Sequence, residues 1–397
     1  MNFAEKQEFD VLIIGGGVIG LSIARELRKN GVERVAIVEK HSACGMGASF
    51  VAAGMLAPQV EADSFDDFFR LCQQSRDLYP NFAAELYAQT KFDVELEQTG
   101  TLYLAFNEKD LSELENRFAW QRVANLPVEK LTTKEVLDLE PNVSSQVLGA
   151  LRFPLDWQVN TRRLIESLNK NLQGFGLNKF MQRNYLDKSR DRDGGEFISR
   201  TVTSLQFEED KEIIIKTERE TFSASFVVIA SGAWTSLLNL PENIKLNAEI
   251  EPIRGQIMSF RHTELFKHVI YTPRGYVVPR MYAEILVGAT VERAGFDSYP
   301  TGAGVSLLLQ TAFEISPKFP NLSFKKMSVG LRPKSPDGWP LLGEYPADSG
   351  LYFATGHYRN GILLAPITAK ILADKIVNNT DSPFLKIFNP SRFVNHS

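Results

Sequence analysis

Residues 11–20 read Val-Leu-Ile-Ile-Gly-Gly-Gly-Val-Ile-Gly, and this stretch decides the fold class of the chain. Its first four residues are all apolar, which is typical of a buried parallel strand. Gly15, Gly17 and Gly20 follow in the pattern G-x-G-x-x-G, and Leu21 opens a run of apolar residues at helical spacing. The stretch therefore predicts a strand that turns sharply into a helix.

Residues 21–39 complete the same unit. The helical pattern ends at Gly31, and residues 35–38 form a second apolar run that predicts another buried strand. Glu39 stands at the end of that run, 19 positions after Gly20. Strand, glycine turn, helix, strand and acid in this order predict a Rossmann-like unit that binds a dinucleotide.

Each residue of this unit has a physical task in binding a dinucleotide. Gly15 allows the tight turn, Gly17 lets the backbone approach the pyrophosphate, and Gly20 lets the helix pack closely on the strand. The helix N-terminus offers N–H groups and partial positive charge to the phosphates. Glu39 would accept hydrogen bonds from a ribose, and an acid there disfavours the 2′-phosphate of NADP. The motif alone leaves NAD and FAD open.

A second glycine-rich turn near the other end of the chain favours FAD. Residues 356–366 read Gly-His-Tyr-Arg-Asn-Gly-Ile-Leu-Leu-Ala-Pro, about 340 positions after the first turn. Two such turns predict a large cofactor held at both ends, with the phosphates at the first turn and the flavin ring at the second. Small side chains at 51–58 would let a flat ring lie against the backbone. A helix that begins at Asn360–Gly361 would stabilise negative charge on the reduced ring.

Composition narrows the class of protein further. The chain has 397 residues, enough for two domains and a large core. Its net charge of −4 gives no electrostatic argument for nucleic acid or an anionic membrane, and no apolar stretch is long enough to span a bilayer. Cys44 and Cys72 are the only cysteines, which fits a reducing, cytoplasmic location. The histidines lack the spacing of metal ligands, so we expect no metal site.

The rest of the chain alternates between helical and strand-like patterns. Helices are expected at about 65–90, 108–125, 132–139, 159–172 and up to 377, and strands at 202–205, 213–216, 226–230, 256–260, 275–280, 285–288, 324–331 and 351–354, with two more around Gly100 between 92 and 106. The polar stretch 187–195 predicts a loop or hairpin.

These patterns predict an α/β (α+β mixed) fold of two interleaved domains. Residues 1–90, 150–245 and 330–397 would form the Rossmann-like FAD-binding domain. Residues 91–149 and 246–329 would form a β-rich substrate-binding domain, because their strands alternate as in an antiparallel sheet with one buried face.

Several short motifs occur together in one order along nearly the whole chain. After the first glycine turn and Glu39 come residues 52–56 (Ala-Ala-Gly-Met-Leu), 330–333 (Gly-Leu-Arg-Pro) and the turn at 356–366. In this the chain resembles the D-amino-acid-oxidase-like superfamily of FAD amine oxidases, and within it the glycine oxidases of thiamine biosynthesis.

The resemblance implies a noncovalently bound FAD and a set of site residues. Arg332 would bind the substrate carboxylate with Tyr276 as its partner, while Met55 would bound the side-chain space and Arg359 would either join the site or anchor its loop. Val202 would meet the adenine through its backbone. The residues expected at the cofactor are Gly15, Gly17, Val18, Ile19, Gly20, Glu39, Lys40, Ala48, Ser49, Ala53, Gly54, Met55, Val202, Gly232, His357, Tyr358, Arg359, Asn360, Gly361, Ile362 and Leu363.

The resemblance also implies an activity: oxidation of glycine, sarcosine and D-alanine by hydride transfer to flavin N5. The products would be glyoxylate, ammonia and hydrogen peroxide, with the imine feeding thiamine thiazole synthesis. The expected partners are a small amino acid and molecular oxygen, and a homo-oligomer is possible. A D-amino-acid or sarcosine oxidase, a dehydrogenase that reduces a quinone, and a non-catalytic flavin-binding subunit stay open. Arg274 departs from the expected pattern, which has His there.

Overall fold

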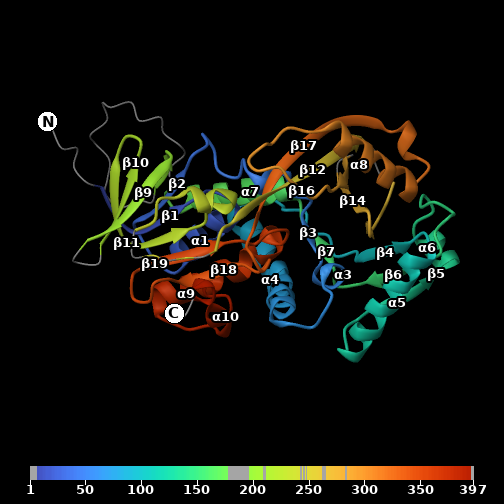
Figure 1. The fold of residues 1–397 in the computed structure, drawn as a ribbon, viewed down its shortest axis with the longest axis horizontal. Helices are drawn as coiled ribbons and strands as arrows, with labels where there is room; N and C mark the ends of the chain where they lie inside the picture. The colour runs from blue at the N-terminus through green and yellow to red at the C-terminus, as the bar shows by residue number, and fades with distance from the viewer. Residues whose placement is uncertain are drawn as a thin grey trace.

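The computed structural model describes two large β-sheets that lie in opposite halves of the molecule, with both described chain ends in the same half (Figure 1). The described residues are 7–177, 196–208, 212–241, 244, 246, 248–261, 265–281 and 284–394. The predicted loop at 187–195 lies outside them. The mixed α/β fold class is confirmed.

The first sheet is the Rossmann-like one, and its central strands are parallel. β1 (Gln7–Ile14) pairs in parallel with β2 (Val35–Glu39) on one side and with β11 (Thr221–Ile229) on the other. The order is β18-β19-β11-β1-β2-β8, and a hairpin extends from β11. The remaining strands are β8 (Glu196–Ser199), β9 (Val202–Phe207), β10 (Ile213–Thr217), β18 (Leu341–Glu344) and β19 (Leu351–Thr355).

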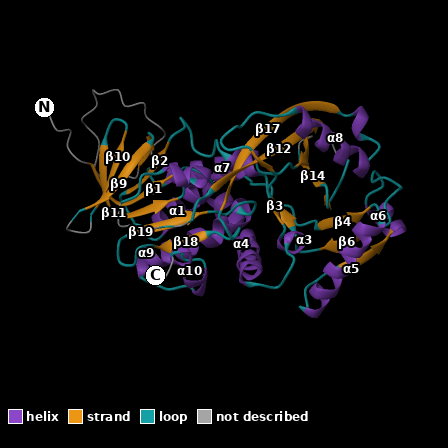
Figure 2. Ribbon diagram, viewed as in Figure 1, coloured by secondary structure: helices purple, strands orange, loops and turns teal. Residues whose placement is uncertain are grey.

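Alternation along these strands divides the interior into two apolar clusters. Ile13 and Ile37 face a cluster built with the helices, whereas Leu12 and Val38 face one built with β9 and β10. Burial on both faces explains why the parallel strands read as continuous apolar runs in the sequence. The helices beside the sheet are α1 (Val18–Lys29), α4 (Asp67–Thr90), α7 (Thr161–Gly174), α9 (Gly361–Asn378) and α10 (Pro383–Ile387) (Figure 2).

The second sheet joins two separate parts of the chain. β4 (Thr101–Ala105) pairs in parallel with β13 (Val269–Thr272). This pairing joins the strands of residues 101–153 to those of residues 251–334 in one sheet. The order is β16-β12-β15-β14-β13-β4-β6-β5, and the long β17 (Ser323–Lys334) pairs with β12. Its other strands are β5 (Glu129–Thr132), β6 (Gly149–Phe153), β12 (Glu251–Arg261), β14 (Gly275–Arg280), β15 (Glu284–Gly288) and β16 (Glu292–Arg293).

Helices α5 (Glu108–Val123), α6 (Thr133–Leu139) and α8 (Gly302–Ile315) accompany the second sheet. Strands β6 and β17 span the expected boundaries at 150 and 330, and both belong to this sheet. Only β4 forms near Gly100, since before it Glu97 makes just an isolated bridge to Gln158. The division into an FAD-binding and a substrate-binding domain stays a prediction.

Three short elements lie between the two halves (Figure 1). They are β3 (Met55–Leu56), α3 (Pro58–Glu61) and β7 (Trp157–Gln158), and β3 pairs with β7. A further short helix, α2 (Ala48–Val51), contacts β17 and α7. A 3-10 helix, η1 (Gly232–Leu237), follows β11, and two further ones are η2 (Phe319–Asn321) and η3 (Pro390–Phe393).

Helix α9 contains a proline in its second turn, and side chains of α4 replace the backbone bonds that this proline disrupts. Pro366 has no N–H to give to the carbonyl of Ile362, and the hydroxyl of Tyr79 donates to that carbonyl instead at 2.5 Å. The hydroxyl of Ser75 donates to the carbonyl of Leu363 at 2.6 Å and accepts from Ile367 N–H at 3.4 Å. The first turn of α9 is therefore fixed by α4 as much as by its own helix.

We expect Tyr79→Phe to lower the free energy of unfolding by about 1–3 kcal/mol, because the buried Ile362 carbonyl would lose its donor. Tyr79 is completely buried, so water cannot take the place of the hydroxyl. Tyr87→Phe on the same helix is the matched control, since Tyr87 is 53% exposed. Urea unfolding of both variants tests this, and equal midpoints for the two would contradict it.

Candidate active site

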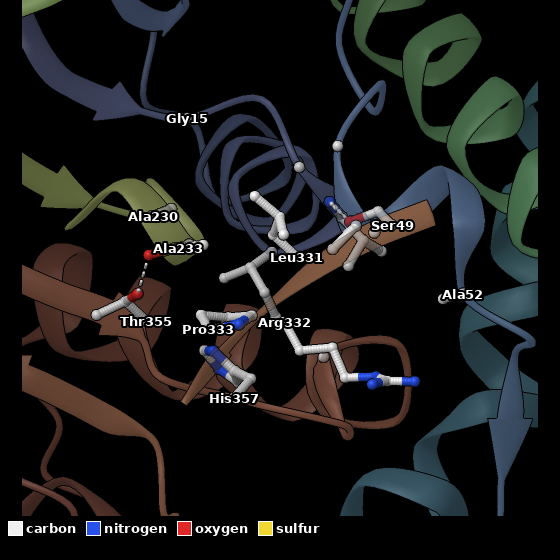
Figure 3. Close-up of a pocket in the computed structure, with 18 of the residues that line it drawn as sticks. Gly15, Ser49, Ala52, Ala230, Ala233, Leu331, Arg332, Pro333, Thr355 and His357 are labelled. Atoms are coloured by element: carbon white, nitrogen blue, oxygen red, sulfur yellow. Dashed lines mark hydrogen bonds between the residues drawn. The ribbon is translucent and has the colours of Figure 1, made fainter. Parts of the chain in front are cut away.

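One elongated cavity runs from the first glycine turn to the second sheet (Figure 3). Its walls come from segments far apart in the sequence: the turn before α1, the α2–β3 connection, the ends of β11 and β17, and the turn before α9. Of the residues expected at the cofactor or substrate, those that line it are Gly15, Gly17, Val18, Ile19, Glu39, Lys40, Ala48, Ser49, Ala53, Gly54, Met55, Val202, Gly232, Tyr276, Arg332, His357, Tyr358, Arg359, Asn360, Gly361 and Ile362.

Gly20 and Leu363 are the two expected cofactor residues that do not line the cavity. A Cβ atom at Gly20 would lie 2.0 Å from the carbonyl oxygen of Gly15, so Gly20 serves the contact between α1 and the turn. Leu363 is 1% exposed and packs in the core behind the second glycine turn. Both residues therefore pack behind the cavity wall and do not line the cavity itself.

The first glycine turn leaves the N-terminus of α1 open to the cavity. Gly15 has φ +111°, and a Cβ atom there would lie 2.4 Å from the carbonyl oxygen of Ala230, just after β11, so only glycine fits. Gly17 occupies the N-cap position and has no side chain with which to cap the helix, and the first turn contains no acidic residue. The hydroxyl of Ser49 accepts the Val18 N–H at 3.1 Å. This arrangement suits a phosphate.

Glu39 faces the same cavity at the end of β2. Its carboxylate accepts N–H bonds from Gly16 at 2.8 Å and from His41 at 3.0 Å, which fixes its position. Lys40 lies 3.1 Å from the ring centroid of Trp234, and burial lowers the pKa of its ammonium group. These residues fit an adenosine with its ribose at Glu39.

The second glycine turn aims a second helix N-terminus at the cavity. Gly356 and Tyr358 adopt positive φ angles of +75° and +47°, and Tyr358 N–H donates to the carbonyl of Pro333 at 2.8 Å. α9 then begins at Gly361 without a capping side chain or an acidic residue in its first turn. His357 bonds to the Thr368 hydroxyl at 3.1 Å, and burial lowers the pKa of this imidazole to about 3, so it is neutral.

Arg332 extends from β17 away from the Gly15 turn (Figure 3). Its Nη1 donates to the Thr290 carbonyl at 2.9 Å, and its charge acts on the phenol of Tyr276, which lines the same cavity. The guanidinium passes over Gly255, where a Cβ atom would lie 2.3 Å from its Cζ. Among the ion pairs of the described residues, none involves Arg332. A cation without an acidic partner in a half-buried cavity is suited to bind an anion.

Tyr276 is buried beside Arg332, and burial raises the pKa of its phenol, so it is protonated and able to donate. Its ring stacks on Tyr271 with centroids 6.3 Å apart. Met55 lines the cavity from β3. The residues at this end thus combine a guanidinium that lacks a carboxylate partner among the described ion pairs with a phenol and an apolar wall.

Arg359 forms an ion pair across the cavity wall with Glu61, at 3.0 Å between Nη2 and Oε1. Glu61 lines the cavity from α3 but was not predicted from the sequence, because nothing in a four-residue helix marks its orientation. Thr290, Gly255 and Trp234 were also not predicted as site residues. Their roles depend on contacts with residues remote in the sequence.

Arg274, whose role the sequence left open, is held outside the cavity. It forms ion pairs with Asp110 and Glu314, each at 2.6 Å, and so ties α5 and α8 to the second sheet. These two carboxylates raise the pKa of the Arg274 guanidinium. Arg274 therefore is not available to a ligand in this cavity.

In the described part of the chain, no group of three or more His, Cys, Asp or Glu side chains could hold a metal ion. Within the same residues, no helix is both long and apolar enough to cross a membrane.

The fold and the cavity together define a flavin enzyme: two open helix N-termini, an acid at the end of β2 and an arginine without a carboxylate partner among the described ion pairs suit FAD and an anionic substrate. The family model described as FAD dependent oxidoreductase matches residues 10–375, and the chain belongs to this family. Its cofactor is FAD, as the two glycine turns predict.

The predicted resemblance to glycine oxidases is confirmed. A glycine oxidase from Geobacillus kaustophilus is 34% identical over 389 residues, which cover 97% of both chains. The crystal structure of glycine oxidase from Geobacillus kaustophilus superimposes with a TM-score of 0.87 at 33% identity, covering 99% of this chain and all of that one. The bifunctional protein ThiO/ThiG of Trichormus variabilis is 33% identical over 97% of this chain and 55% of its own length.

We expect FAD to be bound without a covalent link. Cys44 is buried against Gly16 at the phosphate end, and burial raises the pKa of its thiol, while Cys72 is buried in α4 and does not line the cavity. Neither is suited to attack the ring. Acid precipitation of the holoenzyme should release the yellow colour into the supernatant, and colour that stays in the pellet would disprove this.

Proposed function

We propose that this chain oxidises glycine, sarcosine and D-alanine with molecular oxygen. Glycine, oxygen and water would give glyoxylate, ammonia and hydrogen peroxide. The observation that carries the proposal is the guanidinium of Arg332, which has no carboxylate partner among the described ion pairs and lines the same cavity as Tyr276 and both glycine turns. The names of the glycine oxidases that match over nearly the full length support the same substrate.

Binding would begin with the substrate carboxylate. In a half-buried cavity, that carboxylate requires a partner, and an arginine offers two parallel, permanently charged donors that a lysine cannot reproduce. Thr290 and Gly255 hold the Arg332 guanidinium in place, and Tyr276 has a hydroxyl beside it. The carboxylate end of the substrate would therefore be fixed before any chemistry occurs.

FAD, when bound, supplies the oxidation by accepting the hydride that leaves the substrate α-carbon. The protein aligns the substrate and stabilises charge. The N-terminus of α9 would stabilise negative charge on the reduced cofactor through its N–H groups and its dipole. Neutral His357 does not add a cation there. The amine would enter already deprotonated from solution, so that no general base is required.

Size would restrict the substrate at its α-carbon. Met55, Tyr276 and Ile257 line the cavity near Arg332, and Tyr276 is fixed by its contact with Tyr271. A hydrogen or methyl group fits such a space, and one methyl changes binding by only about 1–3 kcal/mol. A phenyl group would have to displace these side chains. L-amino acids would direct their α-hydrogen away from the cofactor.

A substrate panel tests the proposal directly. We expect glycine, sarcosine and D-alanine to release peroxide with higher kcat/KM than D-proline or D-phenylalanine in one buffer. A clear preference for D-proline or D-phenylalanine would reject the assignment in favour of a general D-amino-acid oxidase. Turnover with a quinone or dye but not with oxygen would make the chain a dehydrogenase, and no bleaching by any amine would make it a non-catalytic subunit.

We infer further that the imine formed in this reaction serves thiamine thiazole synthesis in the cytoplasm. The support is the match to bifunctional proteins named ThiO/ThiG, in which a region like this whole chain is joined to a second part.

A further inference from the structure

The substrate end of the cavity contains two guanidinium groups with different electrostatic surroundings. Arg332 has no carboxylate partner among the described ion pairs, whereas Arg359 is paired with Glu61 at 3.0 Å. The attraction of Glu61 is the largest cause of the raised pKa of Arg359. Arg332, Arg359 and Glu61 all line the same cavity, and the phenol of Tyr276 lies in that wall with them. The net charge of this space is therefore that of a single cation.

The backbone just before Glu61 is held by hydrogen bonds to the buried carboxylate of Asp156. Asp156 accepts the N–H groups of Gln59 at 3.1 Å and Val60 at 2.7 Å, which holds the start of α3. Asp156 is fully buried, and the carbonyl of Ala62 just after α3 accepts a bond from Arg117. Because both ends of this short helix are held, the Glu61 carboxylate has little freedom to leave Arg359.

We propose that Glu61 determines substrate charge by restricting the site to amines that carry one carboxylate. The proposal rests on the proposed function and names a residue that limits its substrates. The first carboxylate binds Arg332. A second carboxylate would meet Arg359, whose charge Glu61 already neutralises, and would also lie close to the negative charge of Glu61 itself. Without Glu61, Arg359 becomes a second anion receptor.

Dead-end ligands test the proposal without turnover. Acetate and malonate differ by one carboxylate, and their dissociation constants are measured from the change in flavin absorbance of the holoenzyme. In Glu61→Gln, which keeps the shape of the side chain, we expect the preference for malonate over acetate to rise at least about tenfold. An unchanged preference overturns the proposal.

Two further variants separate charge from structure. Glu61→Asp keeps the negative charge, so it should keep the preference of the unmodified enzyme, whereas a purely structural role would make it resemble Glu61→Gln. In the double variant Glu61→Gln/Arg359→Ala, the gain for malonate should disappear. A gain that persists without Arg359 would show that another group binds the second carboxylate and would overturn the proposal.

Kinetics then show where the second carboxylate lies. The ratio of kcat/KM for D-aspartate over D-asparagine reports the α-carbon side, and that for iminodiacetate over sarcosine reports the nitrogen side. A rise of either ratio in Glu61→Gln supports the proposal, and a rise of neither overturns it. If the unmodified enzyme does not oxidise glycine, the proposed function fails, while the malonate titration still decides the role of Glu61.

Discussion

Arg332→Ala should lower kcat/KM for glycine by about 30-fold to several thousand-fold while leaving the flavin spectrum nearly unchanged. The reason is that the substrate carboxylate would lie in the cavity without its partner, which costs about 2–5 kcal/mol. The loss should fall mainly on KM, since the clamp acts on bound substrate and transition state alike. Steady-state kinetics with peroxide detection measures it, and Arg332→Lys should recover only part of the activity.

Arg293→Ala is the matched control for this experiment. Arg293 lies in the same sheet, but its side chain is 76% exposed and forms only a surface pair with Glu251. Its removal should leave kcat/KM within about twofold of the unmodified enzyme. If Arg332→Ala oxidised glycine normally, the carboxylate clamp would have to be Arg359, because Arg274 is held by Asp110 and Glu314.

Gly20→Ala should abolish FAD retention and lower the free energy of unfolding by about 3 kcal/mol or more. The added Cβ would lie 2.0 Å from the Gly15 carbonyl oxygen and 3.3 Å from Cγ2 of Ile13 on β1. α1 would therefore have to move away from β1, and its N-terminus would no longer face the phosphates. Cofactor content after desalting and thermal unfolding of the apoprotein measure the two effects.

Gly302→Ala provides a helical glycine for comparison. Gly302 begins α8, and a Cβ atom built there meets nothing within 4 Å. This variant should keep its FAD and gain up to about 1 kcal/mol of stability from helix propensity. Comparable FAD loss in both variants would show that the close approach of α1 to the glycine turn is not what holds the cofactor.

Most residues that the sequence leads us to expect at the cofactor line the cavity, because the determinants of that end are local. The turn at Gly15–Gly20 carries strand, turn and helix within about 20 residues, and Glu39 follows the next strand. The fold class follows from the same alternation. Such features depend on spacing within one segment, and spacing is what a sequence displays directly.

The substrate end was predictable only in part, since it depends on contacts between remote segments. Glu61 forms an ion pair with Arg359, which lies 298 positions away, and no sequence pattern near either residue predicts this contact. Arg274 is engaged by carboxylates on α5 and α8. α8 was itself missed because its sequence opens with two glycines and is apolar on several sides, with Leu307 and Phe313 exposed.

The strand order of the first sheet also determines when, during synthesis of the chain, that sheet can be completed. β1 pairs with β11, which in turn pairs with β19, so the sheet is not complete until residue 355 has left the ribosome. Until then, the apolar faces of β1 and α1 have no α9 to cover them, and the cavity has no flavin-side wall. FAD can therefore be captured only after residues 351–362 have been synthesised. Before the first sheet is complete, the exposed apolar surface of the nascent polypeptide makes it prone to aggregation. Because FAD binds only the folded protein, the supply of FAD when the sheet is completed should raise the yield of folded protein.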